Sequence, residues 1–164
     1  MGEFLGRAQV RVRREQPGVR RATLLASGEE VMFGVPGFQA DFYGFPEDGP
    51  MRAHAGTFDV LTASVCACLT STLGGALTAR GVPVDGERLH AEADGFVEKD
   101  DAGIMVLTRI EVRYRLVADP AKEPEITRAH RHHIPACGVA KSVMSAIDIS
   151  STIEVVPETA DAPA

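Results

Sequence analysis

The sequence predicts an α+β protein, and three observations carry that prediction. Residues 57–80 contain twenty consecutive residues without a charge, from Val60 to Ala79, which is long enough for an extended helix. Residues 104–116 alternate apolar and charged side chains, as a strand with one wet face does. Shorter alternating stretches separated by glycine-containing turns precede the uncharged run. Antiparallel strands around one long central helix are therefore expected.

The N-terminal stretches predict three short strands. Val10 and Val12 alternate with arginines, and Pro17-Gly18 predicts a turn into a second strand at residues 19–25. A glycine turn then leads into a third strand at residues 31–35. Residues 36–56 are rich in glycine, proline and aromatic residues and have no period. They predict a long loop that either wraps the edge of the core or forms the wall of a pocket.

The uncharged run predicts a helix that is buried on most sides. Thr57 offers an N-cap oxygen, Asp59 complements the positive end of the helix dipole, and Arg80-Gly81 supplies a cation and a stop. A membrane span has a similar length, but this run holds four threonines, two serines and two glycines. That polarity favours a core helix over a membrane span.

The second half of the chain predicts a hairpin, a broken helix and a last strand. The hairpin comprises strands at residues 88–97 and 104–116 with a polar turn between them. A polar helix at residues 123–133 is interrupted by Pro135, a short helix follows at residues 137–144, and the last strand covers residues 147–156. The length suits a single domain, residues 1–158, with a flexible tail at residues 159–164.

Composition narrows the classes of function. The 164-residue chain has a net charge of -6, which disfavours a nucleic-acid partner, because phosphate binding needs a concentrated positive field. The N-terminus lacks an apolar run of signal-peptide length, so a cytoplasmic protein without membrane attachment is expected. Three cysteines in that compartment are buried small hydrophobes or reactive thiols rather than a disulfide framework.

The three cysteines occupy different environments. Cys68 shares a helical face with Val65 and Thr72, whereas Cys66 lies about 200° around the helix, so these two thiols cannot bond while the helix is intact. Cys137 follows a proline and opens a helix, where the dipole lowers a thiol pKa. From these residues alone each cysteine is either a catalytic candidate or a packed, inert thiol.

A cluster of histidines suggests a metal site as one alternative. His130 and His133 share a helical face, with His132 beside them, but no cysteine or acid in the sequence completes a tetrahedral set. A solvated helix end or the rim of a pocket near Cys137 is the other interpretation, and no metal is predicted. His54 stands alone and is interpreted as structural, and so is His90.

Both cysteine segments resemble those of the osmotically inducible protein C and organic hydroperoxide resistance family (OsmC/Ohr), in its OsmC-like branch. Residues 56–68, GTFDVLTASVCAC, are similar to the family segment in which an acid, an apolar alanine-rich run and a cysteine lie in the central helix. Residues 137–142, CGVAKS, resemble the family's second cysteine motif, usually Cys-Pro-Val followed by a small or polar residue and a basic one. Their separation and the order of elements also fit.

The resemblance implies a thiol peroxidase that reduces organic hydroperoxides. It implies that Cys68 is the peroxidatic cysteine and Cys137 the resolving one, with Cys66 assigned to packing. It also implies an activating cation, for which Arg20 and Arg21 are the candidates. The acidic partner that it implies is Asp59, for which a role as a helix-N-terminal charge is the alternative.

The same resemblance implies an OsmC-like fold and an intertwined homodimer whose active sites lie at the subunit interface. It implies no cofactor, and an external dithiol or lipoyl-type reductant. The chain departs from the family pattern at three positions. The usual acid is a glutamate at the position of Phe58 in the hydroperoxide-reducing members, whereas the aspartate Asp59 matches the next position, where many OsmC-like relatives carry their acid. Thr57 stands where the central helix usually begins with proline, and Gly138 replaces the proline of the second motif. The competing hypothesis is a dimeric binding protein with inert thiols that holds a small apolar ligand with the loop at residues 38–45.

Overall fold

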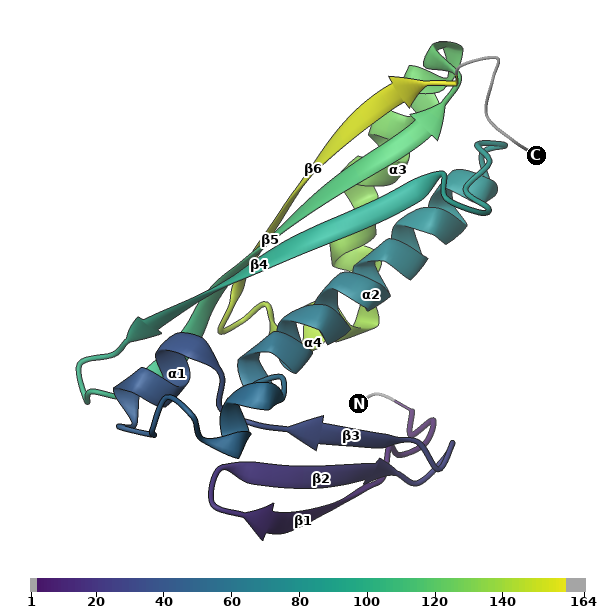
Figure 1. Cartoon of the computed structure of the whole chain (residues 1–164). Coiled ribbons are helices and arrows are strands. Elements are labelled where there is room, and N and C mark those ends of the chain that lie inside the picture. The colour runs from purple at the N-terminus through teal and green to yellow at the C-terminus, as the bar shows by residue number, and fades with distance from the viewer. Residues whose placement is uncertain (1–2, 159–164) are drawn as a thin grey trace. The chain divides into compact units, whose positions relative to one another are not determined.

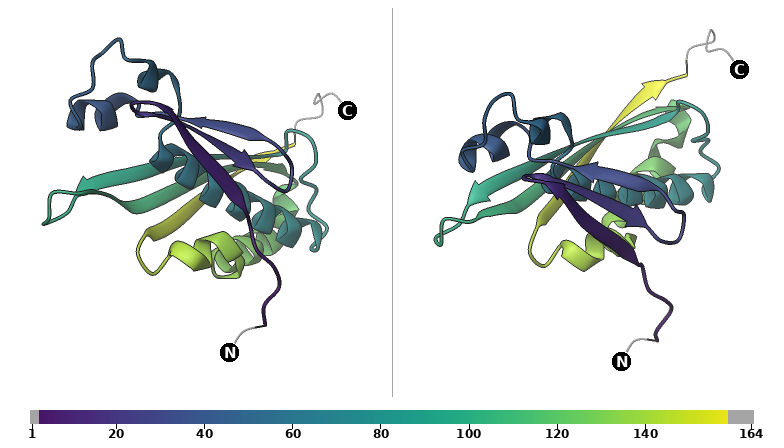
Figure 2. Two further views of the ribbon diagram at one scale, coloured as in Figure 1. Left: turned by 90° about the horizontal axis from the view of Figure 1, so that it is seen from below. Right: turned by 60° about the horizontal axis from the view of Figure 1, so that its bottom comes forward.

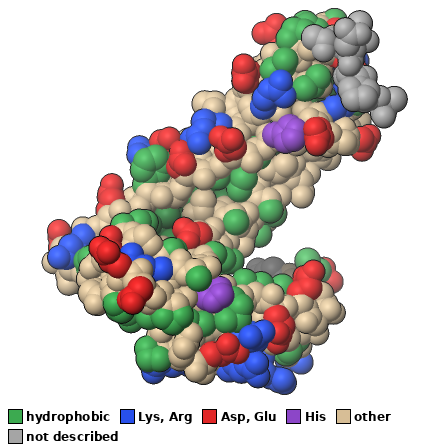
Figure 3. All heavy atoms as spheres, in the orientation of Figure 1, with side chains coloured by type: hydrophobic (Ala, Val, Ile, Leu, Met, Phe, Trp, Pro, Cys, Tyr) green, Lys and Arg blue, Asp and Glu red, His purple; other side chains and the backbone are tan. Residues whose placement is uncertain are grey.

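The computed structural model describes residues 3–158 and divides the chain into two compact units, Met1–Val60 and Leu61–Ala164. Two three-stranded sheets and one long helix confirm the α+β prediction (Figure 1). The tail expected at residues 159–164 lies outside the described residues. Acidic and basic side chains are mixed over the face shown in Figure 3.

The N-terminal unit contains the three predicted strands as an antiparallel meander in the order β1-β2-β3 (Figure 2). A bulge near the end of β1 leads into the turn, where Gly18 has φ +76° and lies against Met51. A side chain at this position would be strained by the backbone and blocked by the methionine, so glycine is needed here. The strands are β1 (Val10–Gln16), β2 (Val19–Leu24) and β3 (Glu30–Phe33).

The stretch at residues 36–56 is not the continuous loop that the sequence predicts. It contains the helix α1 (Gly37–Phe42) and the 3-10 turn η1 (Pro50–Ala53). Ala40 and Met51 from these elements pack with Val19 and Val35 into a small core. The six residues of α1 are too few to show a helical period, which is why the sequence conceals this helix.

The central helix α2 (Thr57–Thr78) has both of its ends fixed by polar contacts. Asp59 accepts a hydrogen bond from the N–H of Gly56 at 2.7 Å, which is half of a capping box. Thr57 is therefore the first helical residue rather than the N-cap. At the other end Arg80 donates to the carbonyl of Ala76 at 2.7 Å, so the predicted C-terminal cation is confirmed.

Burial along α2 differs from the prediction of a helix covered on most sides. In the single chain its buried residues form one stripe: Thr62, Val65, Leu69, Leu73 and Leu77. Small side chains on the opposite side, such as those of Ala63 and Ala67, are exposed.

The run Pro50–Thr78 is long and apolar enough to cross a membrane by length and composition, with 28% of its most apolar window buried. The core helix of a soluble protein meets the same criteria, so this is weak evidence for a span.

The second sheet is mixed, with the order β4-β5-β6. β4 (Leu89–Lys99) pairs with β5 (Met105–Ala118) antiparallel as predicted, but β6 (Asp148–Pro157) pairs with β5 parallel. The expectation of antiparallel pairing fails for this pair, because helices α3 (Glu123–Ala136) and α4 (Gly138–Val143) carry the chain back before β6 begins. The turn η2 (Pro120–Lys122) precedes α3, which continues through Pro135 to Ala136 instead of stopping before the proline.

The alternation of β5 is confirmed only in its second half. Ile110, Val112, Tyr114 and Leu116 are all buried, but earlier in the strand it is Leu107 that is buried. The pairing skips Thr108, since Phe96 faces Arg109 and Val97 faces Leu107. This extra residue forms a bulge that exchanges the two faces of the strand.

Within the second unit, α2 and α3 cover the same face of the sheet (Figures 1 and 2). Gly95 of β4 faces Thr62 of α2 so closely that a Cβ atom would collide with the threonine hydroxyl. Leu107 bounds the same space. The glycine therefore lets the helix approach the sheet, and α2 is held at a fixed depth above it.

Candidate functional site

The structure brings Cys68 and Cys137 together. Cys68 lies in the middle of α2 and is half-buried, whereas Cys137 lies between α3 and α4 and is fully buried. The Cys68 thiol lies close enough to lower the pKa of the Cys137 thiol, and the Thr72 hydroxyl, one turn after Cys68, acts in the same direction. That hydroxyl also lies 2.9 Å from the carbonyl of Cys68, and its one proton can serve only one acceptor well.

The turn at Cys137 is shaped to hold a thiolate. Its backbone is extended, with φ -80° and ψ 120°, and it ends α3 and precedes α4. Burial raises the pKa of the Cys137 thiol, but hydrogen bonds to the sulfur outweigh burial, and the pKa lies below its ordinary value. The donors are the N–H of Ala140, the Cys68 thiol, the Thr72 hydroxyl and the N–H of Val139.

Cys66 has a different environment from the other two thiols. It is half-buried, and burial raises the pKa of its thiol, with an opposing hydrogen bond from Thr70 that is too weak to reverse the shift. Tyr114 lies close enough for the charge of a Cys66 thiolate to raise the tyrosine pKa, although burial raises that pKa more. A protonated, unreactive thiol is favoured here, which supports a packing role for Cys66.

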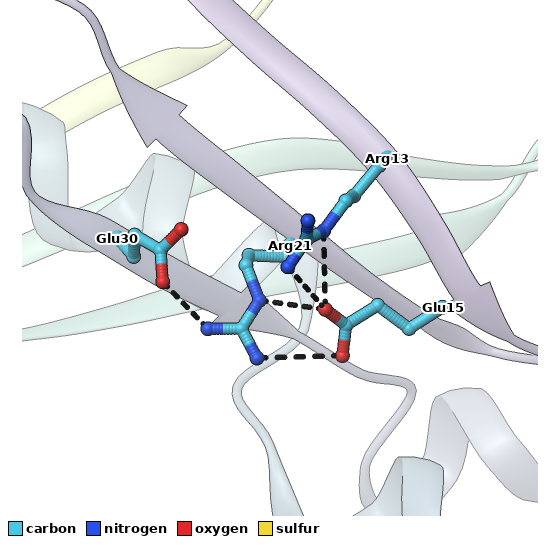
Figure 4. A network of polar contacts seen from close by, with 4 residues as sticks. All are labelled: Arg13, Glu15, Arg21 and Glu30. Carbon is cyan, nitrogen blue, oxygen red and sulfur yellow. Dashed lines mark hydrogen bonds and ion pairs between the residues drawn. The ribbon is translucent and has the colours of Figure 1, made fainter.

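The two candidate arginines are held differently within the N-terminal unit. Arg21 donates to Glu15 and to Glu30, each at 2.6 Å, and Arg13 approaches the same Glu15 at 3.2 Å (Figure 4). The hydrogen bonds that Arg21 donates to Glu15 and then to Glu30 raise its pKa. Its charge is thus already compensated by two carboxylates.

Arg20 donates only to the carbonyl of Gly34, at 2.9 Å, among the contacts described for the N-terminal unit. A carbonyl compensates no net charge, so Arg20 is the better candidate for activating a thiolate. Asp59 accepts from the N–H of Gly56, and the described contacts of residues 3–60 contain no ion pair from Asp59 to either arginine. These three residues belong to the first unit and both paired cysteines to the second, so the pairing of a cation with Cys68 stays a prediction.

The histidine cluster is a buried hydrogen-bonded group rather than a solvated helix end. His133 is 1% exposed, and its Nε2 lies 3.2 Å from the hydroxyl of Tyr114 on β5. His130 stacks on His133 with ring centroids 5.2 Å apart, and its Nε2 lies 2.9 Å from Ser151 on β6. Burial lowers the pKa of both histidines, so the neutral rings are favoured.

His132, by contrast, is exposed on α3. Within residues 3–158, no group of three or more histidine, cysteine, aspartate or glutamate side chains could hold a metal ion. The sequence revealed the shared helical face of His130 and His133, but not their partners on β5 and β6, which lie 19 and 21 residues away.

Gly138 lies where the family motif usually has proline, and its surroundings predict the effect of that substitution on stability. Gly138 is the first residue of α4, a Cβ there would meet nothing within 4 Å, and Cys137 already has the extended backbone that a following proline requires. Gly138→Pro should therefore stabilise the fold by about 0.4–1 kcal/mol, because proline restricts the unfolded chain. A thermal melt should show an increase in Tm of about 1–4 °C. Gly28→Pro is the matched control, since φ +78° there excludes proline, and it should lower Tm.

Comparison with known proteins agrees with this fold. No curated protein matches the chain. An OsmC-like protein from Mycoplasma pneumoniae superposes with a TM-score of 0.71 at 13% identity, covering 93% of this chain and 99% of that one. The organic hydroperoxide resistance protein OhrB of Bacillus subtilis gives 0.60 at 13% identity, over 92% and 100% of the two chains.

A similar result comes from an organic hydroperoxide resistance protein OsmC from Legionella pneumophila, with a TM-score of 0.64 at 12% identity over 93% of this chain and 100% of that one. At these identities the structural likeness establishes the fold. The family model described as OsmC-like protein matches residues 55–152, which is more than half of the chain and includes all three cysteines. The chain therefore belongs to the OsmC-like protein family.

Proposed function

We propose that this protein is a thiol-dependent peroxidase that reduces organic hydroperoxides to alcohols. The observation that carries the proposal is the proximity of the Cys68 and Cys137 thiols, which come from two different helical segments. Two thiols in contact can store the two electrons that a peroxide removes. The structural neighbours from Bacillus subtilis and Legionella pneumophila, whose names refer to organic hydroperoxide resistance, support this class of substrate.

Cys68 is the peroxidatic residue in this proposal because it is the accessible member of the pair. The Cys68 thiolate attacks one oxygen of ROOH, so that an S–O bond forms and the O–O bond breaks. The leaving alkoxide takes a proton and departs as the alcohol. Sulfur is oxidised to a sulfenic acid and the peroxide is reduced. Cys137, with no exposed surface, cannot meet the substrate first.

The middle of a helix gains little from the helix dipole, so the proposal needs a cation from another element beside Cys68. We assign this role to Arg20, whose charge is not compensated by a carboxylate in its own unit. The lowered pKa of Cys137 serves the next step. A thiolate at Cys137 attacks the sulfenic sulfur of Cys68, the S–S bond forms, and hydroxide leaves and is protonated to water.

An external dithiol, of which a lipoyl-type group is one example, then reduces the disulfide by two successive exchanges. The proposal includes a homodimer. The small residues on the exposed side of α2 allow another backbone to approach closely, and a second copy would supply the cover that the single chain lacks.

The direct test is to oxidise the reduced protein with one equivalent of cumene hydroperoxide and map its peptides. A disulfide between Cys68 and Cys137 is expected, with Cys66 free. Two free thiols at Cys68 and Cys137 after the peroxide has been consumed would contradict the assigned roles. Alkylation by iodoacetamide gives an independent measurement, since a peroxidatic Cys68 should react well below about pH 8.5, the ordinary thiol pKa.

A binding function is the second candidate, and the exposed aromatic side chains of the first unit favour it. Phe38, Phe42 and Tyr43 are 55%, 44% and 60% exposed, which is unusual for three neighbouring large rings. Such a protein would hold a small apolar ligand and keep its thiols inert. Unreactive cysteines in the alkylation experiment, together with saturable binding of an apolar fluorophore, would favour this alternative.

A further inference from the structure

The hydrogen bonds of His133 define its protonation state. Its Nδ1 lies 2.6 Å from the carbonyl oxygen of His130, and a carbonyl can only accept, so Nδ1 carries a proton. In the neutral ring Nε2 is then the acceptor, and the Tyr114 hydroxyl donates to it across 3.2 Å. Both nitrogens of this buried ring are satisfied, and the ring orientation is fixed by two elements of the fold.

A second histidine, His130, binds the same helix, α3, to the neighbouring strand β6. His130 Nε2 and the Ser151 hydroxyl are 2.9 Å apart. Tyr114 faces Ile153 in the parallel pairing of β5 with β6, and Val112 faces Ser151, so the two attachment points lie on adjacent strands. The C-terminal half of α3 is thereby tied to the sheet at two places.

This attachment lies directly before Cys137. His133 precedes Cys137 by four residues, which is about 6 Å along a helix. The backbone between them is locally weak, because Pro135 has no N–H to give to the last turn of α3. Beyond Cys137, Gly138 has open space around it in place of the restraint that a proline ring would give. Side-chain anchoring of α3 therefore adds to the two backbone hydrogen bonds of this turn, from the Cys137 N–H to the Ile134 carbonyl and from the Lys141 N–H to the Cys137 carbonyl.

We propose that Tyr114 and His133 are positioning residues for Cys137: their hydrogen bond holds the end of α3 where the Cys137 sulfur meets Cys68. This inference rests on the pairing of the two cysteines in the proposed function, but not on a reaction with peroxide. It predicts that loss of the hydrogen bond weakens formation of the disulfide while leaving Cys68 itself unchanged.

The test is a redox equilibrium of the full chain in mixtures of oxidised and reduced dithiothreitol. The protein carries Cys66→Ser, so that two thiols remain. Oxidised dithiothreitol takes two electrons and two protons from Cys68 and Cys137 and becomes the reduced dithiol as the protein disulfide forms. Tyr114→Phe should lower the equilibrium constant for disulfide formation by about tenfold, equivalent to about 30 mV. The matched control is His132→Gln, an exposed histidine beside the pair, which should change the constant by less than about twofold.

A double variant separates positioning from stability. Tyr114→Phe leaves a buried Nε2 without a partner, whereas Tyr114→Phe with His133→Leu removes both polar groups and should recover much of the lost Tm. The disulfide constant should stay low in the double variant, because the hydrogen bond between β5 and His133 is still missing. Recovery of the constant together with Tm would show a merely structural role and overturn the inference. An unchanged constant in folded Tyr114→Phe, or no Cys68–Cys137 disulfide in the parent, would also overturn it.

The outcome is distinguishable from that of the proposed function. A parent that forms the disulfide with dithiothreitol, responds to Tyr114→Phe and yet consumes no hydroperoxide would support the positioning role while rejecting the peroxidase. A parent that consumes hydroperoxide without sensitivity of its disulfide constant to Tyr114→Phe would reject the positioning role alone.

Discussion

Cys68→Ser should abolish the reduction of cumene hydroperoxide, with a loss on the order of a thousandfold or more. A serine hydroxyl is almost fully protonated at neutral pH and cannot accept the peroxide oxygen as sulfur does. The measurement is peroxide consumption with a dithiol reductant in excess. Thermal melting of the variant should match that of the parent, because serine differs from cysteine by one atom in a half-buried position.

Cys66→Ser is the matched control for this experiment, since it makes the same chemical change two residues earlier on the same helix. It should change the rate by less than about twofold, because the Cys66 thiol is held protonated by burial and lies on another face of α2. Equal losses in the two variants would refute the assignment of Cys68 as the peroxidatic residue.

Cys137→Ser should separate the two halves of the reaction. The first oxidation needs only Cys68, so a burst of one equivalent of peroxide per chain should persist. The sulfenic acid then has no partner within the chain, and turnover with millimolar dithiol should fall by about a hundredfold or more, because an intramolecular attack becomes bimolecular.

The accumulated sulfenic acid can be trapped by dimedone at Cys68 and, with excess peroxide, should advance to the sulfinic acid. The parent should show neither product in quantity. Loss of the burst itself in Cys137→Ser, in a variant that still melts cooperatively, would assign Cys137 to the first step and contradict the order proposed above.

Most of the fold could be predicted from local sequence signals. The uncharged run, its capping Asp59 and the terminal Arg80 define α2 because each signal acts within one turn of the helix. The turns at Gly18 and Gly103 have positive φ angles of 76° and 80°, which glycine provides at no steric cost. Hairpins follow from such turns.

The features that escaped prediction depend on contacts between distant residues. The parallel pairing of β6 with β5 depends on how α3 packs on the sheet, and the sequence of neither strand indicates which strand it pairs with. The bulge at Thr108 exchanges the faces of β5 although the alternation in the sequence continues through it. The single buried stripe of α2 could not be foreseen either, since its apolar and small residues surround the helix.

In the candidate site, too, local features could be predicted from the sequence and contacts between distant residues could not. The separation of Cys66 from Cys68 follows from helical geometry and holds in the structure. The proximity of Cys68 and Cys137 was implied only by resemblance to a family, because no local pattern joins residues so far apart. The hydrogen-bond partners of His133 could not be predicted from the sequence. Tyr114 has the pattern of any inward-facing residue of an alternating strand, and only the position of α3 over the sheet brings it to His133.

The crossover between β5 and β6 makes Cys137 a joint between two helices. α3 ends at Ala136 and α4 begins at Gly138, and the extended backbone of Cys137 separates them. Each residue of a helix turns the chain by about 100° around the helix axis. A one-residue insertion or deletion in the last turn of α3 should therefore rotate Cys137 around that axis and turn its thiol away from Cys68.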